Sequence, residues 1–317
     1  MCAYAEERKA DSVVLMKRLP NSNLAISNVC AVILDYFGSS KTMTCLASLM
    51  DQGLDTVMIV DNSGDQNANA QLKAALDNFS QRHAPFTIHR IINKHNLGFA
   101  KGVNDALRWL EKNQPHRYYL LINNDAEATP GMLSQLLKFM QENKRVALAA
   151  PVIDVGYQQL KGFWYHRLTG LMFFRPVIGS FHYLTGCCLL VDQRIIGDAL
   201  FNEEFFMYGE DVELNWRIRS SDWKIACVNE ATVQHEGVGS SRQGGYFYEY
   251  HMTYGHLLLV RKLARKQWEI PLFYFGRIVT FTTRAIVRIA RYRSLVPIKA
   301  WGQSLRKHFL LHHYNRN

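Results

Sequence analysis

The chain has 317 residues, of which 48% are hydrophobic and 20% are charged, so it can bury a sizeable core and is not a disordered chain. Lys and Arg outnumber Asp and Glu, which gives a formal net charge of +10. This excess indicates a polyanionic partner: a nucleic acid, a phosphorylated substrate or an anionic membrane surface. The six cysteines form no C-x-x-C pair, so neither a zinc site nor a disulfide framework is indicated, and a reducing compartment fits best.

The first 28 residues are polar and mixed, and we expect them to form a lead-in segment. They lack the apolar core of a secretory signal, and no uncharged stretch of the sequence reaches transmembrane length. The sequence therefore predicts a cytoplasmic protein, peripheral on the inner face of the cell membrane.

Four strand-and-helix units follow, and polar or glycine-rich residues come after each strand. The predicted strands cover residues 29–34, 56–60, 86–92 and 118–122. This alternation predicts an α/β fold with a mostly parallel sheet flanked by helices. Parallel strands end at one edge of a sheet, which is where open α/β sheets bind ligands. The residues expected at that edge are Asp35, Asp61, Asn96, Gly98, Gly102 and Asp125.

Asp125 closes the polar cluster that ends the run 118–122. An aspartate at the end of a central strand costs desolvation unless a cation or hydrogen-bond donors compensate it, so a divalent metal is a natural partner. Alternatively, Asp125 caps the helix that begins near Pro130. This segment alone leaves both interpretations open.

After residue 146 the pattern is less regular. Strands are predicted at 146–152, 184–191 and 223–228. The aromatic segment 156–179 between the first two predicts either a core insertion or a hydrophobic wall for a sugar or lipid acceptor.

The stretch 205–217 places Glu210, Asp211 and Glu213 at the start of a predicted helix, where the helix dipole favours anions. It could be an ordinary acidic first turn. An aspartate held ionised there could instead act as a general base that takes a proton from a hydroxyl nucleophile. His235 follows the last predicted strand in a Gly/Ser-rich loop, where a metal or diphosphate role is plausible, although a lone histidine is more often structural.

Together these residues resemble glycosyltransferase family 2, the inverting nucleotide-sugar transferases with the GT-A fold. Within it the chain is similar to the bacterial rhamnosyltransferase-like branch of O-antigen and surface-polysaccharide synthesis. The similarity is carried, in order along residues 29–242, by Val60-Asp61-Asn62-Ser63, Asn96-Leu97-Gly98-Phe99-Ala100-x-Gly102-x-Asn104, Asn123-Asn124-Asp125, Gly209-Glu210-Asp211-Val212-Glu213-Leu214 with Arg217, and His235.

The resemblance implies a role for each position. Asp61 would hydrogen-bond the pyrimidine base, while Asp125 and His235 would hold Mg²⁺ or Mn²⁺ on the diphosphate. Asp211 would be the catalytic base, with Glu210 as the alternative. The other residues expected to contact the nucleotide sugar are Asp35, Asn96, Gly98, Phe99, Gly102, Asn104, Asn124 and Arg217.

The resemblance also implies the substrates. The donor would be a dTDP- or UDP-sugar, with dTDP-rhamnose favoured, and the acceptor a polyprenyl-diphosphate-linked saccharide. A nucleotidyltransferase acting on sugar phosphates is the second interpretation, although Ser39, Ser40 and Lys41 only faintly supply the loop that it needs. A nucleic-acid-binding protein is the third. We expect no nucleic-acid partner, because the basic excess is concentrated after Arg261.

Three regions are therefore predicted: the lead-in 1–28, a GT-A catalytic domain at 29–260 and a basic amphipathic helical region at 261–317. In the last region, apolar residues recur at helical spacing, while Arg277, Arg284, Arg288 and Arg291 fall largely on another face. This pattern predicts a cationic helix that lies on anionic lipid and is sensitive to salt. The alternatives are packing on the catalytic domain and a dimer interface, so a homodimer is possible.

Overall fold

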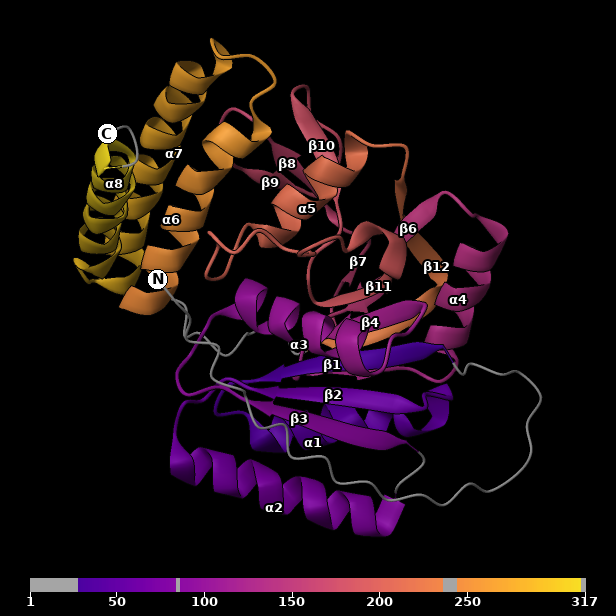
Figure 1. Cartoon of the computed structure of the whole chain (residues 1–317). Helices are drawn as coiled ribbons and strands as arrows, with labels where there is room; N and C mark the ends of the chain where they lie inside the picture. Colours follow the sequence, from indigo (N-terminus) through magenta and orange to yellow (C-terminus); the bar gives the residue numbers. More distant parts are fainter. Residues whose placement is uncertain (1–27, 84–85, 236–243, 315–317) are drawn as a thin grey trace, which may run out of the picture.

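The computed structural model describes residues 28–83, 86–235 and 244–314. The predicted lead-in lies outside the described residues except for Asn28, and so does most of the Gly/Ser-rich loop after His235. The central feature is a nine-stranded mixed sheet with strand order β3-β2-β1-β4-β11-β6-β12-β5, to which β7 is added beside β6 (Figure 1).

The first four predicted strands are confirmed, and they pair in parallel. They are β1 (Val29–Asp35), β2 (Thr56–Asp61), β3 (Thr87–Ile92) and β4 (Tyr118–Ile122). Four helices connect or follow them: α1 (Ser39–Ser48), α2 (Gln66–His83), α3 (Phe99–Asn113) and α4 (Met132–Glu142). The expected α/β architecture is therefore present.

Two hydrophobic clusters cover the two faces of this sheet. Successive side chains of a strand point to opposite faces. Accordingly, Cys30 and Val32 of β1 join a cluster with α3, while Ala31 and Ile33 join one with α1, α2 and α4. Burial on both faces explains why β1, β2 and β4 are largely apolar, whereas β3 at the edge of the sheet includes His89 and Arg90.

The second half of the sheet contains strands that the sequence pattern misplaced. Besides β6 (Val146–Asp154) it contains β5 (Ala126–Ala128), β7 (Gln159–Leu160), β11 (Cys188–Asp192) and β12 (Lys224–His235). The strand predicted at 184–191 begins only at Cys188, because residues 184–187 form the connection from β10 (Ser180–Tyr183). The last strand continues to His235, so placing this residue in a loop is wrong.

The aromatic segment 156–179 is more regular than expected. It contributes β8 (Phe163–His166) and β9 (Met172–Phe173) to a second, three-stranded sheet of order β10-β8-β9. Tyr165 and Phe181 are buried in the main core, whereas Phe174 is exposed. Burial of Tyr165 agrees with the predicted core insertion, and a hydrophobic wall for an acceptor stays a prediction.

Helix α5 (Glu210–Arg219) precedes β12, and three long helices end the chain. They are α6 (Tyr246–Leu263), α7 (Glu269–Tyr292) and α8 (Val296–Tyr314). In Figure 1 they lie together at the upper left, beside the smaller sheet. Leu258 and Leu259 of α6 belong to the main core, while Leu257 packs with Phe281 and Trp301 from α7 and α8. The predicted boundary after residue 260 falls in the last turn of α6, a helix that packs against the main core and also against α7 and α8.

No described helix combines the length and the apolar character needed to cross a bilayer.

The arginines of α7 were expected on the lipid-facing surface, and this is wrong for three of them. Arg277 is fully buried, and Arg284 and Arg288 turn inward to the buried carboxylate of Glu249 in α6. Nη1 of Arg284 lies 2.7 Å from Oε2 of Glu249, and Nε of Arg288 lies 2.7 Å from Oε1. A buried carboxylate costs several kcal/mol of desolvation unless it is paired, which explains the inward orientation. Among the four, Arg291 is exposed.

Arg277 joins α7 to the smaller sheet. Its guanidinium group lies over the ring of Tyr165, 5.3 Å from the centroid, and donates to the carbonyl oxygens of His256 and His166 at 3.4 Å. Gly170 admits it, because a Cβ there would come within 2.6 Å of Nη1. The helix is therefore fixed through its charged side.

Candidate active site

Asp125 and His235 come together at the carboxyl end of β4. Asp125 directly precedes β5, and the antiparallel pairing of β5 with β12 places His235 opposite Ala126. Asp125 Oδ1 lies 3.2 Å from His235 Nε2. Helix α4 begins with Gly131 as its N-cap, and no side chain caps it, so the capping interpretation of Asp125 is wrong.

Asp125 and His235 each shift the pKa of the other toward the charged form. Burial alone would raise the pKa of Asp125, but the hydrogen bond to His235 and the charges of His235 and Lys41 outweigh it, so the pKa lies below its usual value. Hydrogen bonds to Asp125 and to Cys187 raise the pKa of His235 to about 10. The pair is therefore ionic at neutral pH.

This donor set fits a divalent ion only in part. Among residues 28–83, 86–235 and 244–314, no group of three or more His, Cys, Asp or Glu side chains could hold a metal. One carboxylate and one imidazole suffice for an ion that takes its remaining ligands from substrate phosphates and water. Binding would displace the proton from His235, because imidazole ligates metals in its neutral form.

A second acidic site lies at the start of α5, where Gly209 is the N-cap. Asp211 accepts hydrogen bonds from the backbone N–H groups of Val212, at 2.8 Å, and of Gly186, at 3.2 Å. Burial raises the pKa of Asp211 to about 6, against the effect of these donors. Burial and the neighbouring charge of Asp211 raise the pKa of Glu210 to about 8. The two buried carboxylates therefore hold a proton more readily than exposed carboxylates do, and the shift belongs to the pair.

Two polar atoms beside this pair are left without hydrogen bonds. Oε2 of Glu210 and Oγ1 of Thr185 are buried and have no hydrogen-bond partner among the described residues. Buried polar atoms are nearly always satisfied, and exceptions call for a functional explanation. They mark the surroundings of Asp211 as a place organised for something other than stability.

The segment Gly186–Cys187 links the two acidic sites. The N–H of Gly186 binds Asp211, and the carbonyl oxygen of Cys187 accepts a hydrogen bond from the N–H of Asn123 at 2.8 Å. Cys187 also contacts His235. Since successive Cα atoms are about 3.8 Å apart, the metal-binding candidates and the base candidate face one short segment. Asp211 and His235 therefore each contact one of two consecutive residues, Gly186 and Cys187.

Asp35 and Asn124 meet on the other side of β4. Oδ1 of Asp35 accepts hydrogen bonds from Oγ1 of Thr42, at 2.5 Å, and from Nδ2 of Asn124, at 3.4 Å. Burial raises the pKa of Asp35, although these hydrogen bonds oppose the shift. Asp61 follows on β2 in register with Asp35.

The carboxylate of Asp61 already has protein partners. Oδ1 accepts from the N–H and hydroxyl of Ser63, at 3.1 and 2.6 Å, and Oδ2 accepts from Nδ2 of Asn69 at 3.1 Å. Oδ1 already accepts two hydrogen bonds, whereas Oδ2 can accept one more, so contact between Asp61 and a pyrimidine base stays a prediction.

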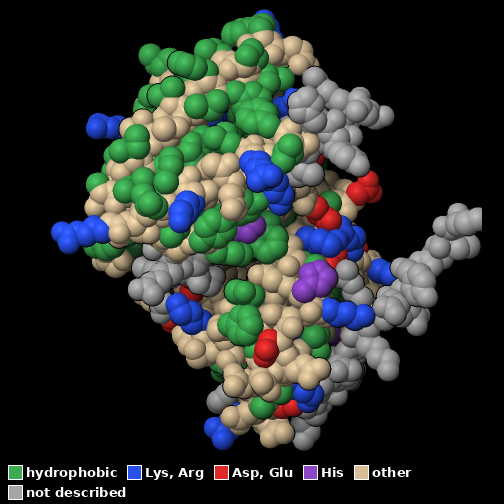
Figure 2. All heavy atoms as spheres, turned by 90° about the vertical axis from the view of Figure 1, so that its left-hand side faces the viewer, with side chains coloured by type: hydrophobic (Ala, Val, Ile, Leu, Met, Phe, Trp, Pro, Cys, Tyr) green, Lys and Arg blue, Asp and Glu red, His purple; other side chains and the backbone are tan. Residues whose placement is uncertain are grey.

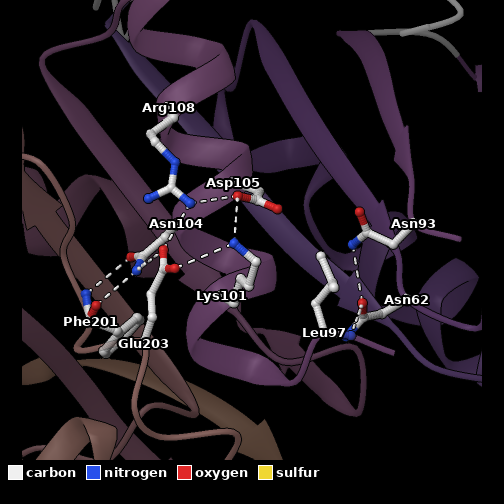
Figure 3. A network of polar contacts seen from close by, with 9 residues as sticks. All are labelled: Asn62, Asn93, Leu97, Lys101, Asn104, Asp105, Arg108, Phe201 and Glu203. Atoms are coloured by element: carbon white, nitrogen blue, oxygen red, sulfur yellow. Dashed lines mark hydrogen bonds and ion pairs between the residues drawn. The ribbon is translucent and has the colours of Figure 1, made fainter. Parts of the chain in front are cut away.

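Asn62 organises the loop before α3 (Figure 3). Its Oδ1 accepts from Nδ2 of Asn93 at 3.1 Å and from the N–H of Leu97 at 3.0 Å, while its Nδ2 donates to Oδ1 of Asn96 at 2.9 Å. The sequence motif includes Asn62, but its central position became evident only from these long-range bonds.

The glycines of this loop allow close packing. Gly98 has a φ of +80°, and a Cβ there would lie 2.2 Å from the carbonyl oxygen of Phe206, so no other residue fits. The same oxygen accepts from the N–H of Phe99 at 2.7 Å. Gly102 lies against Leu34 of β1.

Asn104 and Arg217, predicted to contact the nucleotide sugar, both hold the segment 200–201. Asn104 accepts from the N–H of Phe201 at 3.0 Å and donates to its carbonyl oxygen at 2.7 Å, as Figure 3 shows. Arg217 donates to the carbonyl oxygen of Leu200. These hydrogen bonds show that Asn104 and Arg217 stabilise the segment 200–201, and their contact with the nucleotide sugar stays a prediction.

Sequence reasoning missed Gly186, Cys187 and Thr42 as site residues. Gly186 and Cys187 were assigned to a strand interior, whereas the Thr185-Gly186 pair before an apolar run could have indicated a turn. Thr42 carried no local signal, because only the return of α1 over the end of β1 brings it to Asp35.

Comparison with known proteins identifies the family and the fold. The model of the family described as Glycosyl transferase family 2 matches residues 36–199, just over half of the chain. Asp211 and His235 lie beyond the matched range. No curated protein matches at the threshold applied.

Solved structures share the fold at low sequence identity. The mannosyltransferase PcManGT from Pyrobaculum calidifontis, in complex with GDP-Man and Mn²⁺, has a TM-score of 0.57 and 13% identity, over 89% of this chain and 87% of that one. TarS 1-349 of S. aureus has a TM-score of 0.56 and 12% identity, over 89% and 80%. GalNAc-T7 with UDP, GalNAc and Mn²⁺ has a TM-score of 0.56 and 14% identity, over 74% and 47%.

The family match sets the nucleotidyltransferase interpretation aside, and the structural neighbours confirm the predicted GT-A architecture. The chain belongs to glycosyl transferase family 2 and is a glycosyltransferase.

Proposed function

We propose that the protein transfers a sugar, with inversion, from a nucleoside-diphosphate donor to a hydroxyl of a lipid-linked saccharide acceptor. The reaction would belong to O-antigen or other surface-polysaccharide synthesis. One observation carries the proposal: Asp211 faces the same Gly186–Cys187 segment as the Asp125–His235 pair, with no cationic side chain among its hydrogen-bond partners in the described residues. This arrangement offers a base on one side and a diphosphate anchor on the other.

Asp211 is the base in this proposal. With a pKa of about 6 it is mostly ionised at neutral pH and still basic enough to take a proton from the acceptor hydroxyl. The backbone donors Gly186 and Val212 fix the direction of its carboxylate. Glu210, whose pKa is raised by burial and by the charge of Asp211, is the alternative base. A single base and no protein nucleophile lead to inversion of the anomeric carbon, as in inverting glycosidases.

Asp125 and His235 would hold Mg²⁺ or Mn²⁺. The bound ion would act as a Lewis acid on the departing diphosphate, whose oxygens gain charge during transfer. Asp35, Asp61 and Asn124 would shape the nucleotide side of the site. Asn96, Gly98, Phe99 and Gly102 would form the loop beside it.

The donor is proposed from the resemblance and the neighbours together. A dTDP- or UDP-sugar, with dTDP-rhamnose first, follows from the rhamnosyltransferase-like motifs. The structural neighbours, which are complexed with GDP-Man, with UDP and GalNAc, or with UDP-GlcNAc, support a nucleotide sugar in general. A polyprenyl-diphosphate-linked acceptor would bring the enzyme to the inner face of the cell membrane.

A thermal-shift panel of dTDP-, UDP- and GDP-sugars, each with Mg²⁺, Mn²⁺ or chelator, tests the proposal. A ligand that binds only the native state raises the melting temperature. We expect one nucleotide class to stabilise the protein only with metal, and the corresponding nucleoside diphosphate to be released slowly. The release of pyrophosphate, or the absence of any stabilising nucleotide sugar, would contradict the proposal.

A further inference from the structure

The outward face of α7 is an apolar stripe. Its exposed hydrophobic side chains are 40% to 67% accessible and recur at helical spacing: Leu272, Phe275, Ile278, Val279, Ile286 and Val287. Every exposed position of α7 from Pro271 to Ala290 is uncharged. Figure 2 shows hydrophobic side chains gathered over the upper half of this side of the molecule, where α7 and α8 lie.

This helix is reversed relative to an ordinary surface helix, which turns its apolar stripe to the core and its charges to water. On the inner side of α7, Arg284 and Arg288 form ion pairs with Glu249, and Arg277 is buried. The apolar stripe is left facing outward. Monomeric soluble proteins rarely expose contiguous apolar patches of more than a few hundred Å², so such a stripe marks an interaction surface.

The charge beside the stripe identifies the partner. Residues 270–317 contain no Asp or Glu. The basic side chains exposed on α7, on α8 and between them are Arg291, Arg293, Lys299, Arg306 and Lys307. A symmetric dimer places the same patch on both subunits, so it would bring these like charges near one another. An anionic lipid surface neutralises them and also accepts apolar side chains.

We propose that the outward stripe of α7 inserts into the interface of an anionic membrane, with the basic residues at its C-terminal end next to the headgroups. The inference rests on the proposed lipid-linked acceptor for its biological setting. Trp268, exposed just before α7, extends the surface, since tryptophan is enriched at membrane interfaces. Because three arginines of α7 turn inward, insertion of apolar side chains contributes most of the binding, and salt weakens it only in part.

Vesicle flotation tests this surface. The variants are the double substitution Phe275→Ser with Ile286→Ser, and as a matched control Tyr157→Ser, which changes a side chain that is 90% exposed on the β6–β7 connection. Both targets on α7 are at least 60% exposed, so their replacement leaves the core intact. Removing two inserted side chains should weaken binding to vesicles of equal parts phosphatidylcholine and phosphatidylglycerol by about tenfold or more. The control should bind like the wild type.

The charge contribution is tested separately with Arg291→Glu and Lys299→Glu. This variant should lose affinity for the anionic vesicles and behave like the wild type on phosphatidylcholine alone. Wild-type protein that binds neither vesicle, or a double serine variant that binds as well as the wild type, would overturn the inference. A wild-type dimer in sedimentation equilibrium that the serine variant converts to a monomer would also overturn it, because the stripe would then be a dimer interface.

The outcome is independent of the proposed function. The serine variant should release nucleoside diphosphate from a soluble donor at the wild-type rate, since neither Phe275 nor Ile286 is among the hydrogen-bond or ion-pair partners of Asp211 and Asp125. If the wild type binds vesicles through α7 but acts on no nucleotide sugar, the proposed function fails and the membrane surface stands.

Discussion

Two buried glutamates in neighbouring helices differ in whether their carboxylates have partners. Glu249 of α6 is fully buried, and each of its carboxylate oxygens is paired with an arginine of α7. Glu210 of α5 is also buried, but its Oε2 has no hydrogen-bond partner among the described residues, and its neighbour is another carboxylate. The carboxylate is therefore paired where α6 packs against α7, and within the described residues it lacks a cationic partner where we place catalysis.

The difference separates a stabilising site from a functional one. A paired buried charge is costly to break, because its partners are left uncompensated. In the unpaired carboxylate cluster, burial already destabilises the charged forms, and the raised pKa values of Glu210 and Asp211 reflect this cost. Removing a charge from the second site should therefore spare the fold and harm the reaction, and the reverse should hold for the first.

The largest expected effect is on turnover. Asp211→Asn keeps the shape of the side chain but removes the base, so transfer should fall by about 10² to 10⁴. Donor binding in a thermal-shift assay should be nearly unchanged. Because the folded protein raises the pKa of Asp211, ionisation costs stability as the pH rises through about 6, and the variant should be at least as stable as the wild type at pH 8. Near-wild-type turnover would refute the assignment; Glu210→Gln, assayed in parallel, tests the alternative base.

The next largest effect is on folding. Glu249→Gln leaves Arg284 and Arg288 without their carboxylate, so the free energy of unfolding in urea should fall by about 3–5 kcal/mol. Glu204→Gln is the control, since this exposed residue pairs with Lys262 at 3.0 Å and such a pair contributes at most about 1 kcal/mol. Equal losses in the two variants would show that burial of the pair does not matter.

A smaller effect concerns the metal. Asp125→Ala should weaken metal-dependent binding of the nucleotide sugar by at least about tenfold, because it removes a carboxylate ligand. The melting temperature without ligand should also fall, because His235 loses its ion-pair partner. Activity that is insensitive to chelator in the wild type would exclude this role.

The smallest effect is a dependence on pH. As the pH falls through the pKa of Asp211, the base becomes protonated, and kcat/KM should decline about tenfold per pH unit below about pH 6. A profile that stays flat to pH 5 would point to a base other than Asp211.

The sequence predicted the polar sheet edge well because its signals are local. Asp35 and Asp61 come directly after an apolar run and Asp125 follows one with two residues between, and parallel pairing alone brings such residues together. The contribution of His235 depends on β5, a three-residue strand too short to leave a pattern.

The orientation of α7 could not be predicted for a different reason. Helical periodicity separates an apolar face from a charged one, but it does not say which face is inward. The charged face of α7 turns inward because its arginines pair with Glu249, which lies 35 residues before Arg284 in the sequence. The role of Gly186 could not be predicted for a similar reason, because its N–H contacts Asp211 only when α5 packs against the β10–β11 connection.

The stereochemistry of the reaction tests the central claim most directly. Proton NMR of the glycoside that the wild-type enzyme forms on an acceptor hydroxyl, compared with its preferred donor, reports the configuration at the anomeric carbon. Direct displacement with Asp211 as the only base predicts inversion relative to the donor. Retention would contradict the account, because it requires a covalent intermediate or another route that a single base does not provide.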